Sequence, residues 1–553
     1  MKKILATILA VAMLATTFVG CGGAPTGEEA GSKNPDASTD GGQPVEAADI
    51  NACIGPEPET LDPALNKSVD GACYAIHAFE GIYKFNSENE AVPGQAEKVE
   101  VSEDGLTWDI TLRDDIKWSD GKDVTVDDFI FSWQRAASPE TASDYANLFD
   151  VIEGGADVYQ GKADPSTLGV TKVDDRNMQI KLAAPCPYFD KLLAFPIYYP
   201  VRKDVVEGND GWTQDAATFI GNGPMMLKEW KHKESITYVK NPYYYDADKV
   251  TNSAINFVLL EDDNAKMAAY DNGELDYVFQ LPIDEIDALK QRPEFGTINE
   301  IGTYYLAFQT EKKPFDDPRV RKALSLAIDR NYIVETVSKQ GELPASAIVA
   351  AKVSENDKSF RENGGDYYSI KPEDYEKNVA EAKQLLADAG YPDGKGFPTF
   401  EYTTNTATLH LGIAEALQNM WKENLGIECK IAQQEWNVFL ATRPAGTFEV
   451  ARDGWIADYD DPLTFLEIFK SDNGNNDCHW KNADFDKLID QAKAEPDADK
   501  RFALLHEAED VWAENMPGAP IFYYADTFLK RDTINGYWDS PLGYKFFMYC
   551  TKA

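Results

Sequence analysis

From about residue 50 to the end of the chain, segments with a strand pattern alternate with segments with a helix pattern. Residues 106–112 alternate apolar and polar side chains with a period of two, which predicts a strand. Thr125 then precedes an acidic turn, and Phe129 and Trp133 follow at helical spacing, which predicts a helix that begins after Thr125. An alternation of this kind is typical of lobes that combine sheets with helices.

The same signals predict four further elements. Pro318 stands at the first position of a helix that we expect to continue to Gly341, because apolar residues recur on one face. The others are a helix over 372–389, a helix over 409–424 and a strand over 427–432.

The composition excludes several classes of protein. The chain has 553 residues, of which 43% are hydrophobic and 12% aromatic, so it is neither a small disulfide scaffold nor a fibre nor a disordered chain. Ninety-four Asp and Glu against 53 Lys and Arg give a formal charge of −41. No nucleic-acid partner is expected, because this charge repels phosphate.

The chain begins with the pattern of an export signal. Lys2 and Lys3 precede an apolar run over residues 4–19. This run is shorter than the roughly 20 residues of a membrane-spanning helix, and a Gly-rich, acidic stretch follows it. We therefore predict a signal peptide over residues 1–20.

A lipid attachment site is predicted next. Residues 18–21, Phe-Val-Gly-Cys, resemble a bacterial lipobox, in which the peptidase cuts before the cysteine and the new terminus carries diacylglycerol. Cys21 is thus the predicted lipidation site, and the polar residues 21–48 form the predicted flexible tether. The expected location is the outer face of the bacterial cytoplasmic membrane or the periplasmic space.

Six further cysteines are scattered over the body of the chain. In an oxidising compartment they could form disulfides, in any of about 15 pairings, or all remain thiols. Their spacing contains no CxxC pair, so no metal site is predicted. They are Cys53, Cys73, Cys186, Cys429, Cys478 and Cys550.

The sequence lacks the usual signatures of enzymes. It contains no G-x-S-x-G elbow, no P-loop and no H-E-x-x-H, and only five histidines. Paired acids such as Asp460 and Asp461 could serve a glycosidase, but with 94 acids such pairs arise by chance. No catalytic residue and no cofactor is predicted, and a secreted hydrolase stays a minor alternative.

Residues 448–462 combine a strand pattern with side chains suited to binding. Gly454 marks a place where another group approaches the strand closely, and Trp455 and Asp458 follow it. A strand with free backbone groups, an aromatic wall and an isolated anion would suit an extended peptide with an ammonium terminus.

Together with several other blocks, this segment resembles the oligopeptide-binding proteins of ABC importers, in the extracellular solute-binding family that also includes dipeptide and nickel receptors. The resemblance extends from about residue 50 to about residue 550. Its blocks are 57–63 (EPETLDP), 108–133 (WDITLRDDIKWSDGKDVTVDDFIFSW), 220–224 (IGNGP), 313–330 (KPFDDPRVRKALSLAIDR), 387–391 (ADAGY) and 451–462 (ARDGWIADYDDP).

The resemblance implies an α/β fold of the two-lobed periplasmic-binding-protein type (class II, cluster C) with an extra domain, closing on its ligand about a hinge. Domain I would consist of residues 49–75, 196–303 and 526–553. Domain II would be 76–195, and domain III, the peptide-binding lobe, would be 304–525.

The resemblance also implies roles for charged residues. Asp458 matches the carboxylate that pairs with the α-ammonium of the peptide. Arg452, Arg443 and His410 match positive positions that receive the C-terminal carboxylate of ligands of different lengths, a task for which arginine is well shaped.

The other matched positions lie along the ligand. Trp455 and Glu57 would be near side-chain pockets, and the backbone groups of Gly454 and Ile456 would pair with the ligand chain. Some relatives carry a cysteine of a domain-bridging disulfide at the position of Ile456, so the six cysteines cannot be paired by analogy.

These expectations describe a lipid-anchored monomeric receptor, not an enzyme, that captures short oligopeptides and delivers them to the permease subunits of an ABC transporter. The same scaffold binding a dipeptide, a metal chelate or an oligosaccharide is the alternative within the family, because one scaffold serves many solutes. The sequence does not predict the length or the residue preference of the ligand.

Overall fold

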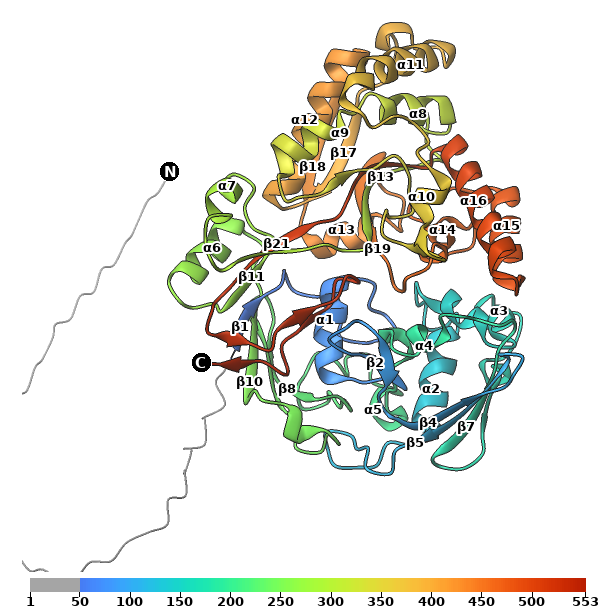
Figure 1. Ribbon diagram of the computed structural model, residues 1–553, viewed down its shortest axis with the longest axis vertical. Helices are drawn as coiled ribbons and strands as arrows, with labels where there is room; N and C mark the ends of the chain where they lie inside the picture. The colour runs from blue at the N-terminus through green and yellow to red at the C-terminus, as the bar shows by residue number, and fades with distance from the viewer. Residues whose placement is uncertain (1–49) are drawn as a thin grey trace, which may run out of the picture. The chain divides into compact units, whose positions relative to one another are not determined.

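The computed structural model describes residues 50 to 553, which belong to one compact unit. The predicted signal peptide, the predicted lipidation site Cys21 and the predicted tether lie outside the described residues. Within residues 50 to 553, no helix is both long and apolar enough to cross a bilayer. Three main sheets and their helices form a lower and an upper lobe in the view of Figure 1.

The lower lobe is built on a seven-stranded sheet. Its central strand β1 is parallel to both of its neighbours, and the other pairs are antiparallel. Helix α1 (Val69–Ala78) is almost entirely buried, and its Tyr74 meets Phe257 edge to face with ring centroids 5.0 Å apart. In order across the sheet, the strands are β12 (Phe295–Ile298), β21 (Asp526–Lys530), β11 (Tyr277–Phe279), β1 (Ile50–Cys53), β10 (Ala254–Val258), β9 (Ser235–Lys240) and β8 (Met225–Lys231).

A four-stranded antiparallel sheet extends the lower lobe. Helix α2 (Val126–Ala137) begins with a capping box formed by Thr125 and Asp128, as the sequence predicts. The predicted strand over 106–112 is confirmed as β5, one residue shorter at its start. The strands, in order, are β4 (Ala96–Val101), β5 (Thr107–Leu112), β7 (Asn177–Lys181) and β6 (Val170–Lys172).

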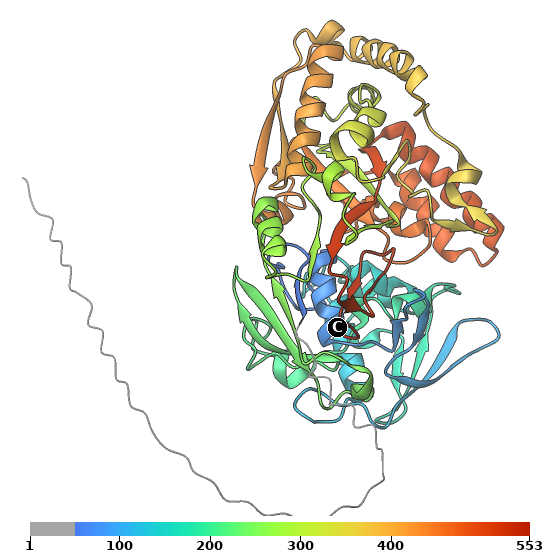
Figure 2. The ribbon, with the colours of Figure 1, turned by 60° about the vertical axis from the view of Figure 1, so that its left-hand side comes forward.

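The upper lobe is a six-stranded mixed sheet flanked by helices (Figure 2). Its strands, in order, are β14 (Leu343–Pro344), β20 (Gly518–Tyr523), β13 (Gly302–Phe308), β19 (Val450–Ile456), β17 (Phe400–Asn405) and β18 (Cys429–Gln434). Its longer helices are α8 (Pro318–Leu326), α11 (Tyr375–Asp388), α12 (Thr408–Leu425), α13 (Trp436–Thr442), α15 (Ala483–Ala494) and α16 (Ala498–Asn515).

The chain joins the two large sheets through two short connections. Residues 299–301 lead from β12 in the lower lobe to β13 in the upper lobe, and residues 524–525 lead back from β20 to β21. Short connections of this kind are where a hinge can absorb rotation. The predicted boundaries of three domains stay a prediction, because the described residues form one compact unit.

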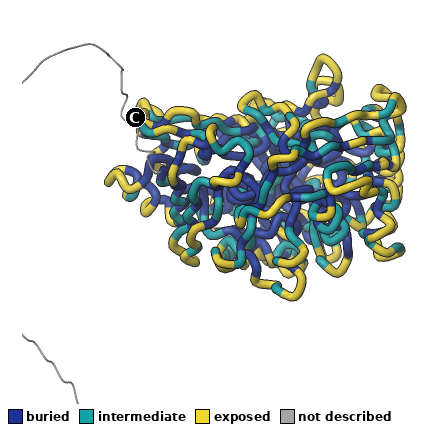
Figure 3. The backbone as a smooth tube through the Cα atoms, turned by 90° about the horizontal axis from the view of Figure 1, so that it is seen from below, coloured by how far each residue is buried: buried dark blue, intermediate teal, exposed yellow. Residues whose placement is uncertain are grey.

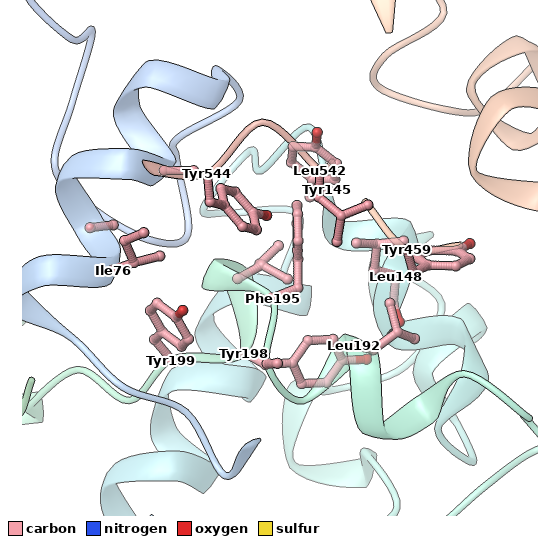
Figure 4. Packing of buried hydrophobic residues seen from close by; sticks show 14 of the residues in the cluster. Ile76, Tyr145, Leu148, Leu192, Phe195, Tyr198, Tyr199, Tyr459, Leu542 and Tyr544 are labelled. Atoms are coloured by element: carbon pink, nitrogen blue, oxygen red, sulfur yellow. Dashed lines mark hydrogen bonds between the residues drawn. The ribbon is translucent and has the colours of Figure 1, made fainter. Parts of the chain in front are cut away.

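An apolar core continues from one lobe to the other. One cluster of buried residues contains both Tyr198 of the lower lobe and Trp512 of the upper lobe. Tyr188 stacks on Tyr459 across the boundary, with ring centroids 4.4 Å apart. Figure 4 shows residues of the buried cluster around Tyr145. Figure 3 shows exposed segments outside a buried interior. The lobes are therefore in direct contact.

The single helix predicted over 318–340 is wrong. The structure has α8 followed by α9 (Arg330–Tyr332) and a π-helical turn. Asp329 starts the second segment by accepting a hydrogen bond from a backbone amide of α9 (3.0 Å). The buried guanidinium of Arg330 donates to two carbonyls at the break, which replaces hydrogen bonds of a continuous helix.

The other predicted elements are present with shifted ends. Helix α12 contains the predicted helix over 409–424, and Gly426 ends it with a φ of +70°. Helix α11 begins at Tyr375, after a 3₁₀ turn over Pro372–Asp374. Strand β18 begins two residues later than predicted.

A buried ion pair connects the lobes away from their chain connections. The ammonium of Lys493, on α15, lies 2.5 Å from a carboxylate oxygen of Asp150 in the lower lobe. It also lies 2.5 Å from Glu467 of its own lobe. Removing one member of such a pair leaves buried charge uncompensated, at a cost of about 3–5 kcal/mol.

We expect Lys493→Met to favour separation of the lobes. The substitution leaves Asp150 buried without its cation only when the lobes are together, so the closed arrangement loses stability. Small-angle X-ray scattering of the ligand-free protein should show a larger radius of gyration. Lys481→Met is the control, since Lys481 pairs with Glu311 inside the upper lobe (2.8 Å). An unchanged radius for Lys493→Met would contradict this role.

Candidate ligand-binding site

A cavity of about 220 Å³ lies between the lobes. Residues 54–56 and 66–70 of the lower lobe line it, as do residues 452–458 of the upper lobe and Tyr524 in the returning connection. Eight Asp and Glu residues and five Lys and Arg residues contribute to its wall. This balance favours cationic groups in the cavity.

Strand β19 has an open edge beside this cavity. β13 pairs with every residue of β19, whereas β17 pairs only with its first two residues. The amide of Ala457 donates to the carbonyl of Ile301 (2.8 Å). Because hydrogen-bonded positions alternate along an antiparallel pair, the backbone groups of the odd-numbered residues of β19 face β13. The backbone groups of Gly454 and Ile456 therefore face the opposite side, beyond the residues that pair with β17.

Gly454 is approached closely, as predicted, but by a group of the protein itself. A Cβ atom at this position would overlap with the hydroxyl of Tyr524. The amide of Gly454 donates to Asp453 Oδ1 (2.8 Å), so this donor is already occupied in the present arrangement.

Asp458 is a buried carboxyl group at one end of the open edge. It is 6% exposed. Its Oδ1 accepts a hydrogen bond from the hydroxyl of Tyr145, which belongs to the lower lobe, and its Oδ2 accepts one from Thr464 Oγ1, both at 3.2 Å. No cation of residues 50 to 553 lies within ion-pair distance of it. Burial raises the pKa of Asp458 to about 8, and the two hydrogen bonds oppose this only in part.

Arg452 is the cation on β19 that lines the same cavity as Asp458. Its guanidinium lies over the rings of Tyr304 and Trp436, 5.4 and 5.9 Å from their centroids. Within the described part of the chain it has no carboxylate at ion-pair distance, and its Nε has no acceptor. It is therefore available to an anionic group of a ligand.

Arg443 and His410 also line the cavity, but their charges are not free. The guanidinium of Arg443 is paired with Asp453 and, at 3.4 Å, with Asp477. Burial lowers the pKa of His410 well below its usual value, and the positive charges of Arg452 and Lys266 act in the same direction. At neutral pH, His410 can offer a hydrogen bond but no charge.

The two predicted pocket residues are placed differently. Trp455 lines the cavity, and its indole nitrogen donates to Thr464 Oγ1 (3.2 Å). Glu57 is not among the residues of the cavity wall, and its carboxylate bonds to His232 Nδ1 (2.7 Å) instead.

Several cavity residues were not predicted from the sequence. Tyr145 lies 313 positions before Asp458 in the chain, and no local pattern connects them. Tyr145 packs against Phe195, with ring centroids 5.3 Å apart, and Tyr544 lies beside them (Figure 4). Tyr524 belongs to the returning connection, where no periodic pattern marks it.

The arrangement is suited to an extended zwitterion. Asp458 and Arg452 are six residues apart, so their Cα atoms are at most about 20 Å apart at about 3.3 Å per residue. An open strand edge lies between the carboxyl group of Asp458 and the guanidinium of Arg452, neither of which has an ion-pair partner within residues 50 to 553. In residues 50 to 553, no group of three or more potential ligating side chains could hold a metal ion.

We expect Asp458→Asn to stabilise the ligand-free protein increasingly as the pH rises from about 5 to 8. The folded wild type keeps this carboxyl protonated up to about pH 8, whereas the unfolded chain releases the proton near pH 4. The unfolded state therefore binds fewer protons in this window, and wild-type stability falls as the pH rises. The gain of Asp458→Asn over the wild type in free energy of unfolding should reach at most about 5 kcal/mol at pH 8.

Urea unfolding of ligand-stripped protein at pH 5, 6.5 and 8 measures this effect. Asp460→Asn is the control, because Asp460 bonds to Ser354 outside the cavity. Parallel pH profiles for the wild type and Asp458→Asn would show that Asp458 is not held protonated.

Known proteins match this chain over most of its length. The family model described as "bacterial extracellular solute-binding proteins, family 5 Middle" matches residues 90–477. The oligopeptide-binding protein OppA of Bacillus subtilis (strain 168) is 35% identical over 498 residues, which is 88% of this chain and 89% of that protein.

Solved structures match as well. The murein tripeptide-binding protein MppA of Escherichia coli has a TM-score of 0.86 at 34% identity, covering 92% of this chain and 99% of that one. OppA of Haemophilus influenzae in complex with the peptide RPPGFSPFR has a TM-score of 0.86 at 30% identity, also covering 92% and 99%.

An open, unliganded form of MppA has a TM-score of only 0.62, at the same 34% identity and over 92% of this chain and 98% of that one. Because the sequence identity is equal and the TM-score is lower, the lobes of the open form are arranged differently from those of this chain. The structure described here therefore corresponds to a closed arrangement.

Proposed function

The chain belongs to family 5 of the bacterial extracellular solute-binding proteins, and on this premise we propose that it captures short peptides and delivers them to the permease of an ABC importer. The observation that carries the proposal is Asp458, a buried carboxyl group without a cation at the end of an open strand edge. The names of its relatives, which include oligopeptide- and dipeptide-binding proteins, point in the same direction.

The α-ammonium of the peptide would supply the missing cation of Asp458. A charge-assisted hydrogen bond in a site closed to water is stronger than a neutral one. Thr464, in the same lobe as Asp458, would hold one carboxylate oxygen before the ligand arrives, and Tyr145 of the lower lobe would add the second hydrogen bond on closure. A blocked N-terminus would leave the carboxylate without this partner.

The backbone of the peptide would extend β19 along its open edge. Hydrogen bonds to the main chain do not depend on the side chains of the ligand, so the site would tolerate many sequences. The C-terminal carboxylate would meet Arg452, whose planar guanidinium can hold it with two hydrogen bonds. A ligand held at both ends would be at most about six residues long, at about 3.3 Å per residue.

Closure would couple capture to delivery. The ligand would contact β19 in the upper lobe and Tyr145 in the lower lobe, so its binding would favour the closed arrangement over the open one. The family and the named relatives are binding proteins, and the proposed activity involves no bond cleavage.

We expect a free N-terminus to dominate the affinity. Trialanine should bind the wild type more tightly than N-acetyl-trialanine, and Asp458→Asn should lose about 2–5 kcal/mol of affinity for trialanine but little for the acetylated form. Isothermal titration calorimetry measures each dissociation constant after bound ligand is removed.

Asp460→Asn is again the matched control, with unchanged affinities expected. Native mass spectrometry of protein purified without unfolding tests the ligand class independently. A series of bound masses separated by amino-acid residues supports the proposal, whereas one discrete non-peptide mass or cleavage of added peptides overturns it.

The proposal includes a lipid anchor at Cys21. We expect Cys21→Ala to abolish incorporation of labelled palmitate, because alanine offers no thiol to carry the diacylglycerol. The variant should either be released into the medium or keep its signal peptide. Cys186→Ala is the control and should keep the label. Labelled fatty acid on Cys21→Ala would refute the anchor while leaving peptide capture unaffected.

A further inference from the structure

Two buried acidic residues lie at the two connections between the lobes and line the cavity. Glu300 belongs to the connection between β12 and β13, and Asp526 is the first residue of β21. They are 3% and 4% exposed. The capture of a peptide ammonium by Asp458 assigns no role to either of them.

The carboxylate of Glu300 lacks a hydrogen-bond donor. No amide, hydroxyl or amine donor of residues 50 to 553 is hydrogen-bonded to Oε1 or Oε2, and the side chain that can share a proton with Glu300 is the second acid, Asp526. The ion pair with Lys545 is long, with 3.9 Å between Nζ and Oε1. A buried carboxylate without donors costs free energy until a cation or a proton reaches it.

Lys545 does not compensate this group of acids. Its ammonium donates to the carbonyl of Gly543 (2.8 Å) and lies 3.7 Å from the centroid of the Phe279 ring. It also attracts Asp526 and Asp539. One ammonium is therefore shared among the carboxyl groups of Glu300, Asp526 and Asp539, which we call the acidic cluster.

Arg452 reduces the imbalance without removing it. It is close enough to favour the charged form of Asp526, but it is not within ion-pair distance of it. With Glu300, Asp526 and Asp539 all ionised, Arg452 and Lys545 leave one negative charge, which a proton balances in the absence of a ligand cation. A ligand carboxylate bound at Arg452 would increase that excess.

The backbone of Glu300 lies opposite that of Asp458. The amide of Ala457 bonds to the carbonyl of Ile301, and Asp458 and Glu300 are the next residues along the two chains. The surrounding wall includes the apolar groups of Val69 and Ile456. A wall of this kind can hold the aliphatic stem of a long basic side chain.

We propose that Glu300 and Asp526 form a subsite for a basic side chain, the ammonium of lysine or the guanidinium of arginine, in one of the first three residues of the ligand. This inference rests on the proposed function, because it needs a peptide anchored at Asp458. The basic group would bring the charge that the cluster lacks, and a neutral side chain of the same shape would not.

Electrostatics of the ligand-free cluster agree with this assignment. Burial, followed by the negative charge of Asp526, raises the pKa of Glu300 well above its usual value. Without ligand, burial and the second acid therefore favour the protonated form of Glu300. An incoming cation would take the place of that proton.

Tripeptides of alanine that carry arginine or citrulline at position one, two or three test the subsite. Arginine and citrulline have nearly the same shape and differ in charge. We expect the wild type to bind the arginine peptide about tenfold or more tightly at one position. In the double variant Glu300→Gln, Asp526→Asn, the dissociation constants of the arginine and citrulline peptides should differ by no more than about threefold. The affinity for the citrulline peptide should be unchanged.

The control is Asp144→Asn, which removes one negative charge from the cavity wall outside the cluster, where Asp144 pairs with Lys67 (3.0 Å). It should keep the arginine-to-citrulline ratio. If the cluster only supports the fold, the double variant weakens both peptides equally, and this result overturns the subsite.

The comparison in the wild type needs no variant and so does not depend on the folding of one. Equal affinity for both peptides at all three positions overturns the subsite but leaves peptide capture standing. Failure of every peptide to bind overturns the proposed function together with the subsite.

Discussion

The carboxyl group of Asp458 is buried between two lobes without a cation, and this costs free energy whether the group is protonated or ionised. In the closed arrangement, Asp458 has only the hydroxyls of Tyr145 and Thr464 as partners. Closure must therefore be stabilised elsewhere, and the buried pair of Lys493 and Asp150 does so away from the cavity. A ligand then adds a cation to a site whose geometry already exists.

The cavity separates two kinds of recognition. In the proposed binding mode, the open edge of β19 would offer main-chain groups that accept any residue, whereas Asp458 and Arg452 would hold the two ends of the ligand. The acidic pair of Glu300 and Asp526 adds a local preference on top of this tolerance. Because that pair lies at the connections between the lobes, a group bound there would contact the segments that move when the cleft opens.

Local chemistry explains which features could be predicted from the sequence. The capping box at Thr125 and the glycine end of α12 are short-range signals, and both elements occur as predicted. The break after α8 was missed because the burial of Arg330 depends on distant carbonyls. The family resemblance directed attention to the segment of Asp458, and the structure adds what no local pattern encodes, such as the contact with Tyr145.

The cysteines have a consequence for how the protein can be produced. All six in the described residues are free, and five of them are buried. On the central sheet of the upper lobe, Ile456 lies opposite Gly302, so no covalent bond ties β13 to β19. Acquisition of the native state by residues 50 to 553 thus requires no oxidant, and a reducing cytosol is a suitable place to express them.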